Sequence, residues 1–232
     1  MPLFYHPALD LTDPALSPDE SRHGVQVLRL RAGDPLTVVD GRGTYYEAVV
    51  KEANAKRCTL AIERTRREDS RPHRIHLAVA PTKNIDRTEW LVEKAVEVGV
   101  DQLSFVVTAH SERRVLKTER LMKKAVAAMK QAGRATLPTI NDIQTLSAFL
   151  KRPTEAQRFI AYVEANSNIH LKQLARPTGS YVVLVGPEGG FSPAEVAQAE
   201  QSDYRPVSLG SYRLRTETAG LVAALTLNLL NE

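Results

Sequence analysis

The segment that most constrains the fold is Val182–Glu195, where an apolar run passes into a glycine-rich turn and then into the start of a helix. The run Val-Val-Leu-Val predicts a strand buried on both faces, as in a parallel sheet. Ser192, Pro193 and Glu195 then supply an N-cap, a first-turn proline and a capping-box partner. The segment therefore predicts a strand–turn–helix unit of an α/β protein.

The glycines of this turn indicate a binding site. At the carboxyl end of a parallel strand they let the backbone approach a ligand, and their amides are free to bind it. The turn matches neither the dinucleotide pattern GxGxxG nor the phosphate-loop pattern GxxxxGK[ST]. A second segment, Val207–Ala219, again places a glycine just after a strand. We expect the two loops, about 20 residues apart in sequence, to face one crevice.

The rest of the second half alternates strands with helices. Apolar runs predict strands at 75–80, 103–107, 159–163, 181–185 and 206–209. A helix is expected after the first strand, with Asp86 as N-cap, Glu89 as capping-box residue and Gly99 as its stop. This order predicts a parallel sheet with helices on both faces. The final helix, 219–230, is apolar nearly all round, which is typical of a central helix or of one that packs on another subunit.

The first 70 residues have a different pattern, mostly of short strands. Segments 36–39, 45–50 and 58–63 are rich in β-branched, aromatic or alternating apolar residues. A small β-barrel suits this pattern, with Cys58 as a buried packing residue. The charged, proline-terminated segment 64–72 is interpreted as a linker. We therefore predict one domain over residues 1–71 and a second over 72–232.

Composition limits the class of protein. The 232 residues contain a single cysteine, which excludes an internal disulfide or a cysteine-based zinc cluster, and no His/Cys/Asp spacing indicates a metal site. No apolar run is long enough to cross a bilayer and no signal peptide is visible, so we expect no membrane association and a cytoplasmic location.

The net charge of +4 is modest but unevenly distributed, because residues 110–134 hold 8 basic and 2 acidic side chains. Six of these cations lie on one side of a predicted helix from Thr118 to Ala132, with only Glu119 near them in sequence. They form either a surface that contacts phosphates or a merely solvated helix face.

These motifs resemble one protein family. GPEGG, followed by LGSYRLRTETA, is similar to the RsmE branch of the SPOUT methyltransferases. Members of that branch methylate N3 of a uridine in 16S ribosomal RNA. Further segments that share the resemblance are 23–29 (HGVQVLR) with Gly33, Lys83 with 90–100, 111–114 and 131–134 with Pro138. Two departures are Leu3, where the family often has Arg, and 128–131 (AMKQ), where Ala-x-Glu-Gln is more usual.

The resemblance implies a fold and a cofactor that composition and spacing do not show. It implies an N-terminal PUA-like β-barrel that binds RNA and a C-terminal trefoil-knot α/β domain with a parallel sheet. That domain would dimerise and bind S-adenosylmethionine. The residues expected to bind the cofactor are Val185, Gly186, Glu188, Gly189, Gly190, Leu209, Gly210, Leu214, Thr218 and Ala219.

Methyl transfer to N3 requires removal of the N3 proton and stabilisation of the resulting anion. We expect Arg215 to stabilise that anion or to orient the nucleotide, unless it forms a structural pair with Glu188 or Glu217. Glu188 is a candidate to receive the proton, although an acid at a helix start also has a capping role. Glu217 is the third catalytic candidate.

The partner of the protein is expected to be ribosomal RNA of the small subunit or an assembly intermediate. The candidate RNA-contacting residues are Arg22, His23, Arg29, Arg31, Lys83, Arg113, Arg114, Lys123, Lys124, Lys130 and Arg134. Two other functions remain open at this point. One is a methyltransferase of the same fold acting on another RNA atom, such as a ribose 2′-hydroxyl. The other is a non-catalytic factor that binds RNA during ribosome assembly.

Overall fold

The computed structural model describes residues 1–154, 156–162 and 169–232, and the chain forms two compact units. The first unit contains residues 1–70 and 126–137, and the second contains 71–125 and 138–232. The expected division after residue 71 did not anticipate that 126–137 cluster with the first unit. They do so through long-range hydrogen bonds: the Tyr45 hydroxyl donates to the Gly133 carbonyl (3.1 Å) and the Gly43 amide to the Ala135 carbonyl (2.9 Å).

The first unit is built on a four-stranded sheet. Its strands are β1 (Leu3–Tyr5), β2 (Pro35–Val39), β3 (Thr44–Glu52) and β4 (Thr59–Arg67), hydrogen-bonded in the order β1-β2-β3-β4. β1 pairs parallel with β2, and the other two pairs are antiparallel. Between β1 and β2 lie helix α1 (Pro18–Arg22) and a π-helical turn, η1 (His23–Val27). Cys58 is fully buried in the core of this unit, as predicted.

The charged segment after residue 63 is a strand, so the interpretation of 64–72 as a linker is wrong for its first four residues. β4 continues to Arg67 at the edge of the sheet. There the Arg66 guanidinium lies 3.6 Å from the centre of the Tyr45 ring and 3.5 Å from the Glu47 carboxylate. Long charged side chains suit an edge strand that faces water, and the polar composition alone did not distinguish this strand from a loop.

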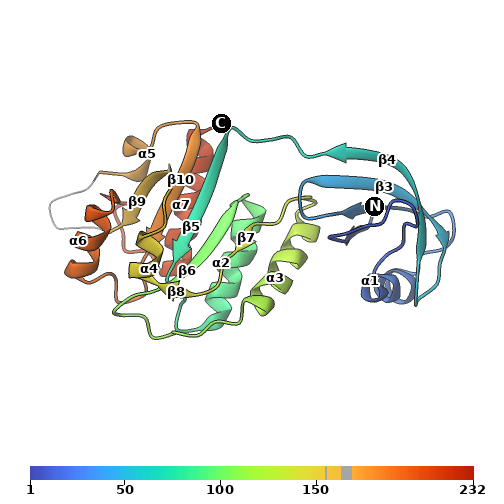
Figure 1. Ribbon diagram of the computed structural model, residues 1–232, viewed down its shortest axis with the longest axis horizontal. Helices are drawn as coiled ribbons and strands as arrows, with labels where there is room; N and C mark the ends of the chain where they lie inside the picture. Colours follow the sequence, from blue (N-terminus) through green and yellow to red (C-terminus); the bar gives the residue numbers. More distant parts are fainter. Residues whose placement is uncertain (155, 163–168) are drawn as a thin grey trace. The chain divides into compact units, whose positions relative to one another are not determined.

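The second unit contains a wholly parallel sheet (Figure 1). Its strands follow the order β11-β9-β10-β5-β6-β7, with β8 paired to β6. The strands are β5 (His73–Val79), β6 (Gln102–Val107), β7 (Thr139–Ile140), β8 (Gln144–Thr145), β9 (Gln157–Ala161), β10 (Gly179–Val185) and β11 (Arg205–Val207). Parallel pairing through residues 179–185 and 73–79 confirms the predicted buried strand. Val163, at the end of the strand expected at 159–163, lies outside the described residues.

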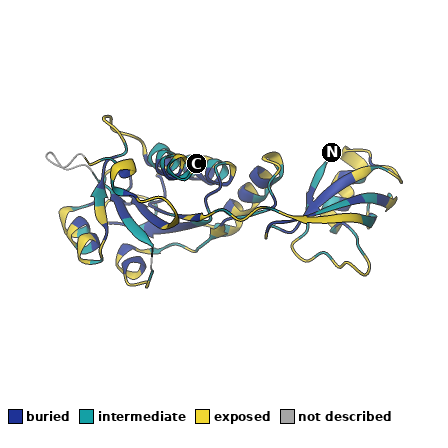
Figure 2. Ribbon diagram, turned by 90° about the horizontal axis from the view of Figure 1, so that it is seen from above, coloured by how far each residue is buried: buried dark blue, intermediate teal, exposed yellow. Residues whose placement is uncertain are grey.

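Helices cover both faces of this sheet, as predicted. The helices that complete the unit are α2 (Ile85–Glu97), α4 (Leu146–Leu150), α5 (Leu171–Leu174), α6 (Pro193–Gln201) and α7 (Thr216–Leu230). α4 and α6 share one hydrophobic core with Ala78, Val182 and Leu184 of the sheet. α2 and α7 pack against each other, and α7 also contacts β5 and β10. Figure 2 shows the resulting band of buried residues along the strands and the inner helix faces.

The start of α2 differs from the prediction. Asn84 is the N-cap, and its side chain accepts a hydrogen bond from the Asp86 amide (3.0 Å). The expected capping-box residue Glu89 is buried and forms ion pairs with Arg120 and Lys124 instead. An acidic residue three positions into a helix fits a capping box in sequence. Here the carboxylate forms ion pairs with cations of another helix.

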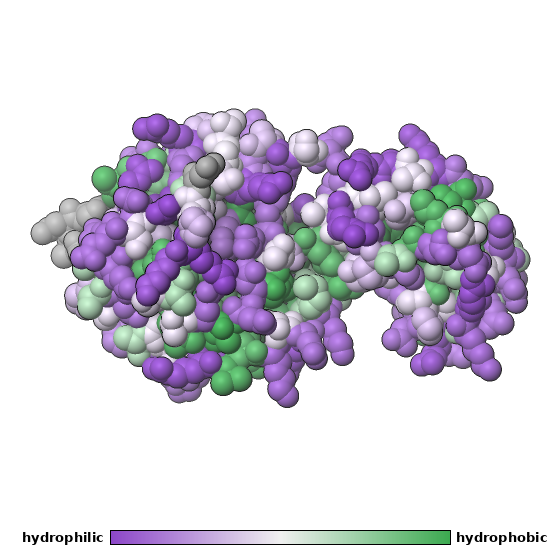
Figure 3. Space-filling model, in the orientation of Figure 1, coloured by the Kyte–Doolittle hydropathy of each residue, from purple (hydrophilic) through white to green (hydrophobic). Residues whose placement is uncertain are grey.

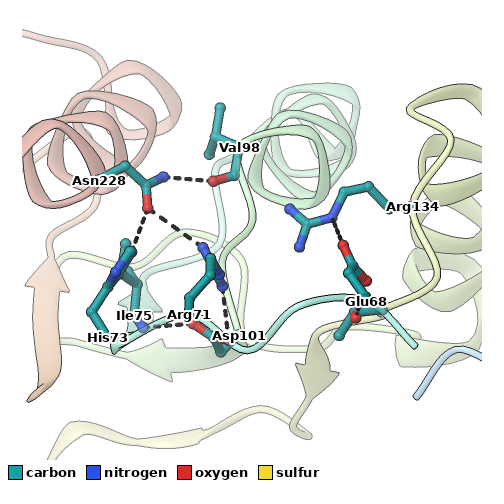
Figure 4. A network of polar contacts seen from close by, with 9 residues as sticks. Glu68, Arg71, His73, Ile75, Val98, Asp101, Arg134 and Asn228 are labelled. Carbon is teal, nitrogen blue, oxygen red and sulfur yellow. Dashed lines mark hydrogen bonds and ion pairs between the residues drawn. The ribbon is translucent and has the colours of Figure 1, made fainter. Parts of the chain in front are cut away.

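A polar network joins the start of β5 to the ends of α2 and α7 (Figure 4). The Asn228 side chain donates to the Val98 carbonyl (2.6 Å), and its oxygen lies 2.9 Å from His73 Nε2. The Asp101 carboxylate accepts from Arg71 (2.9 Å) and from the Ile75 amide (2.8 Å). The network satisfies helix-end carbonyls and fixes the carboxyl end of α7 on the sheet. No helix of the described chain has the length and apolar character needed to cross a membrane.

Candidate active site

The site is a pocket of about 520 Å³ where β9, β10 and β11 reach their carboxyl ends. This edge of a parallel sheet is where α/β proteins bind ligands. Residues that follow β10 and β11 supply most of the wall, and the end of β9 closes one side. The lining residues are Ala161, Tyr162, Val185, Gly186, Pro187, Glu188, Gly189, Gly190, Phe191, Val207, Leu209, Gly210, Tyr212, Arg213, Leu214, Arg215, Thr216 and Ala219.

The turn after β10 is shaped by its glycines and by the capped start of α6. Gly190 has a φ of +71°, a conformation that suits glycine, and its amide donates to the Pro187 carbonyl (2.9 Å). The predicted capping box is present, because the Ser192 hydroxyl accepts from the Glu195 amide and the Glu195 carboxylate accepts from the Ser192 amide. The second Glu195 oxygen accepts from the Ala109 amide (2.7 Å). The cap therefore joins this turn to the segment that follows β6.

Three further residues hold the same turn through hydrogen bonds. The Lys83 amide donates to Glu188 Oε1 (3.2 Å), and the Thr216 hydroxyl donates to the Gly186 carbonyl (2.9 Å). His110 Nδ1 lies 3.1 Å from the carbonyl oxygens of both Gly189 and Gly190. Loops from β5, β6 and α7 thus fix the glycine-rich turn from several sides.

The loop after β11 lines the opposite wall and is held less firmly. Gly210 has a φ of +136°, and Tyr212 is 88% exposed. Within the described residues, Arg213 and Arg215 form no ion pair and no side-chain hydrogen bond. Arg215 is the N-cap residue of α7, but its side chain makes no capping bond. Two unpaired guanidinium groups therefore border the pocket, where they favour an anionic or electron-rich ligand.

The pocket gathers nearly all the residues expected to bind a cofactor. Of the ten, only Thr218 is absent from the lining. Sequence reasoning missed the lining residues Ala161, Tyr162, Pro187, Phe191, Val207, Tyr212, Arg213 and Thr216. Several of these lie within the two motifs, so their position in the glycine-rich loops was the available signal. Ala161 and Tyr162 were detectable only as the end of a third strand of the same parallel sheet.

Two of the three catalytic candidates line the pocket and the third does not. Arg215 and Glu188 line the pocket. Glu217 does not: it is only 7% exposed, and its carboxylate lies 3.8 Å from the Arg87 guanidinium of α2. The alternative structural pairing of Arg215 with either glutamate is not observed among the described residues. Glu217 thus faces α2 outside the pocket lining, and the catalytic roles of all three residues stay predictions.

The candidate RNA-contacting residues of the second unit are partly engaged by the protein itself. The Lys83 ammonium pairs with Glu112 (2.8 Å), which raises the pKa of Lys83. The Arg113 guanidinium donates to the carbonyls of Thr82 (3.1 Å) and Lys83 (2.8 Å). Both residues thereby join the segment that follows β5 to the segment that follows β6. Arg114 is exposed and forms no ion pair or side-chain hydrogen bond within the described chain.

The cations of helix α3 (Thr118–Gln131) are more neutralised than the sequence suggested. Their partners come from distant elements, which is why Glu119 alone was counted. The ion pairs are Arg120–Glu89, Lys124–Glu89 (3.6 Å), Lys130–Glu20 (2.6 Å) and Arg134–Glu68 (3.6 Å). Among the described residues, Lys117 and Lys123 are the exposed cations of this group without an ion pair. The expected phosphate-contacting face is thus much reduced.

The remaining candidates, Arg22, His23, Arg29 and Arg31, are exposed on the first unit. Hydrophilic side chains cover most of the surface visible in Figure 3, with apolar patches between them. Arg22 ends α1, His23 begins the π-helical turn, and Arg29 and Arg31 come after the turn. They remain accessible to a polyanion.

Comparison with known proteins agrees with this fold. A sequence model described as an RNA methyltransferase domain matches residues 69–228, and one described as an RNA methyltransferase PUA domain matches residues 16–63. The ribosomal RNA small subunit methyltransferase E of Mycobacterium bovis is 31% identical over 217 residues, which are 88% of this chain and 82% of that protein.

Two solved structures extend the match to nearly the whole chain. A "probable rRNA-methyltransferase" from Porphyromonas gingivalis is 41% identical with a TM-score of 0.91, covering 100% of this chain and 98% of that one. The ribosomal RNA small subunit methyltransferase E of Neisseria gonorrhoeae, bound to S-adenosylmethionine, is 30% identical with a TM-score of 0.89 and the same coverage. The fold is that of a SPOUT-type RNA methyltransferase with an N-terminal PUA domain. The chain belongs to the ribosomal RNA small subunit methyltransferase E family.

Proposed function

We propose that this protein transfers a methyl group from S-adenosylmethionine to N3 of a uridine in small-subunit ribosomal RNA. The observation that carries the proposal is the pocket at the carboxyl ends of β9, β10 and β11, formed by the two glycine-containing loops. The relatives named for this activity, one of them bound to S-adenosylmethionine, support it. A ribosomal RNA substrate would place the protein in the cytoplasm.

The pocket fits S-adenosylmethionine. A volume of about 520 Å³ lies within the range of small-molecule sites. Val185, Leu209 and Leu214 offer apolar walls for the adenine ring, and the turn at Gly189 and Gly190 lets the backbone approach the ligand. When bound, S-adenosylmethionine supplies a methyl group on a positively charged sulfur.

The reactive residues of the chain act on the uridine. Loss of the N3 proton leaves a negative charge on the uracil ring, and the unpaired Arg215 guanidinium would stabilise that charge. Glu188 is held by the Lys83 amide through Oε1. Its other oxygen would accept the N3 proton through water. The anchored backbone around Glu188 keeps this carboxylate at the pocket wall.

The protein is further proposed to be a homodimer. One face of α7 is apolar and largely uncovered: Leu225 is 40% and Leu229 68% exposed. Leu221 and Val222 lie on the same face at helical spacing and are partly exposed. Trp90, 39% exposed, lies on the adjoining helix α2. A second copy would bury this surface beside the pocket. Light scattering at micromolar concentration should give a dimer mass, and a monomer would oppose this part of the proposal.

The decisive test identifies the methylated nucleoside. Small subunits from a strain that lacks this gene would be incubated with the protein and labelled S-adenosylmethionine, followed by nucleoside analysis. N3-methyluridine is the expected product. A ribose-methylated product would favour a related methyltransferase acting on the 2′-hydroxyl. Binding of subunits without methyl transfer would favour an assembly factor. Mapping of the same RNA in the deletion strain identifies the nucleotide.

A further inference from the structure

The turn that follows α1 in the first unit has an unusual backbone. His23–Val27 forms a π-helical turn, in which the Leu28 amide donates to the His23 carbonyl (3.1 Å) and the Leu30 amide to the Gly24 carbonyl (3.0 Å). Arg29 then has a φ of +58°, which a non-glycine residue rarely adopts. Short π-helical turns and such positive φ values recur at functional sites, where the surrounding structure maintains the strain.

The packing beneath the turn determines which side chains it exposes. Gly24 lies so close to the core that a Cβ there would meet Leu30 Cδ1 at 3.0 Å and Phe4 Cζ at 3.3 Å. Leu30 itself is buried. With these residues directed inward, the next apolar pair points to solvent: Val27 is 64% and Leu28 45% exposed. The two side chains form a small apolar surface, which an apolar face of a ligand would cover.

Cations flank this apolar pair along the chain. Arg22, Arg29 and Arg31 are exposed on either side of it, and none of their side chains forms an ion pair or hydrogen bond within the described residues. The side chain of His23 is exposed in the same turn. Three unpaired guanidinium groups within a few residues of an exposed apolar pair are complementary to a ligand with a phosphate backbone and exposed apolar faces. Single-stranded RNA has both, because its unstacked bases are accessible.

We infer that Val27 and Leu28 contact an unstacked nucleobase of single-stranded or looped RNA, while the flanking arginines contact its phosphates. The inference rests on the proposed function for the choice of RNA as partner, and it adds a preference for unpaired segments. In an RNA duplex the bases are stacked inside, so the apolar pair finds no surface to cover. The arginines alone would bind both forms, since phosphate contacts carry no such preference.

The test compares the full-length protein with a Val27→Ser, Leu28→Ser double variant in filter binding. The probes are a 20-nucleotide single-stranded RNA and the same RNA annealed to its complement. We expect about tenfold weaker binding of the single strand, an unchanged affinity for the duplex and an unchanged salt slope. An Arg22→Gln, Arg31→Gln variant should instead weaken binding of both probes and reduce the salt slope by about 0.7 per lost contact on the single strand.

A matched control removes an exposed leucine of the same unit that lies outside this turn. Leu11, 56% exposed, provides the Leu11→Ser variant, which should bind both probes like the wild type. Equal losses for both probes, no loss, or the same loss with Leu11→Ser would overturn the inference. So would a change of oligomeric state in light scattering with unchanged RNA affinity, because the pair would then contact another copy. If the wild type methylates subunits and the double variant binds the single-stranded RNA normally, only this inference is refuted. If the wild type does not methylate subunits, the proposed function is refuted.

Discussion

The loop after β10 and the loop after β11 line the same pocket but are held in different ways. The first, through Gly186–Ser192, is joined by hydrogen bonds to Lys83, His110 and Thr216. The second presents Tyr212, Arg213 and Arg215 to solvent without an ion pair among the described residues. Side chains that already have partners are ordered before a ligand arrives, whereas free ones remain available to it.

This difference suggests a division of labour. A preorganised backbone favours tight binding of a cofactor that every turnover requires, because no free energy is then lost in ordering the loop. An RNA nucleotide must enter and leave, and exposed arginines can follow it. We therefore expect changes in the first loop to affect cofactor binding and changes in the second to affect the chemical step.

The largest effect is expected for Gly189→Val. A Cβ at Gly189 would meet the His110 Cβ at 2.9 Å, so the anchored turn must move away from the 108–111 segment. Calorimetry should show S-adenosylmethionine affinity reduced at least about 100-fold, a loss of roughly 3 kcal/mol. Ala197→Val, an exposed position on α6, is the control and should bind normally. Affinity within threefold of the wild type for Gly189→Val would contradict the idea of a preorganised turn.

Arg215→Gln tests the second loop. Removing a group that stabilises developing negative charge lowers kcat by about 100-fold or more. Cofactor affinity should stay within about twofold, and α7 should not lose stability because Arg215 makes no side-chain cap. Single-turnover methylation and calorimetry measure the two quantities. Lys172→Gln, which removes an exposed charge on α5, should leave both unchanged. Parallel losses of cofactor affinity and rate would erase the distinction between the loops.

Both loops keep their different properties only while the parallel sheet is folded. The stability of that sheet depends on pH through His76, a part-buried residue of β5. Burial, together with the charge of Arg152, lowers the pKa of His76 to about 4 from 6.5. The unfolded chain therefore binds a proton that the folded protein does not, and stability falls as pH drops from 6.5 toward 4. Urea unfolding should show a loss of about 2 kcal/mol between pH 7 and pH 5. His76→Gln should have a smaller loss, and an equal loss would exclude this histidine as its source.

The smallest expected effect is on RNA binding by α3, where cations in ion pairs lie beside exposed cations that have none within the described chain. Lys123 is exposed and unpaired in the described structure, so Lys123→Ala should lower the RNA salt slope by about 0.7 if it contacts a phosphate. Lys130 pairs with the part-buried Glu20. Lys130→Ala should leave the salt slope unchanged and reduce stability by about 1 kcal/mol. An equal change in slope for both variants would mean that the ion pairs of α3 open when RNA binds.

Much of the candidate site was predictable because its signals are local. The buried run 182–185, the capping box at Ser192 and the glycines of both loops are short patterns whose physical meaning depends on neighbours in sequence. The anchoring contacts were not predictable. Lys83 and Glu188 are 105 residues apart, and His110 and Gly189 are 79 apart. No periodicity relates such pairs, so the difference between the two loops could not be inferred.

The sequence by itself determined the α/β class, the two glycine-containing loops and, through its resemblance to a known family, the expected cofactor and RNA substrate. Only the tertiary structure decided which charged residues are free. It placed Glu217 against Arg87, Glu89 against Arg120, and Glu20 against Lys130, 110 residues away. An ion pair depends on distance in space, and the stacking of helices on a sheet brings together charges that the chain separates. Local composition therefore overestimates the free positive charge on α3, because the fold pairs several of its cations with distant carboxylates. Arg215 has no such ion pair among the described residues and borders the pocket.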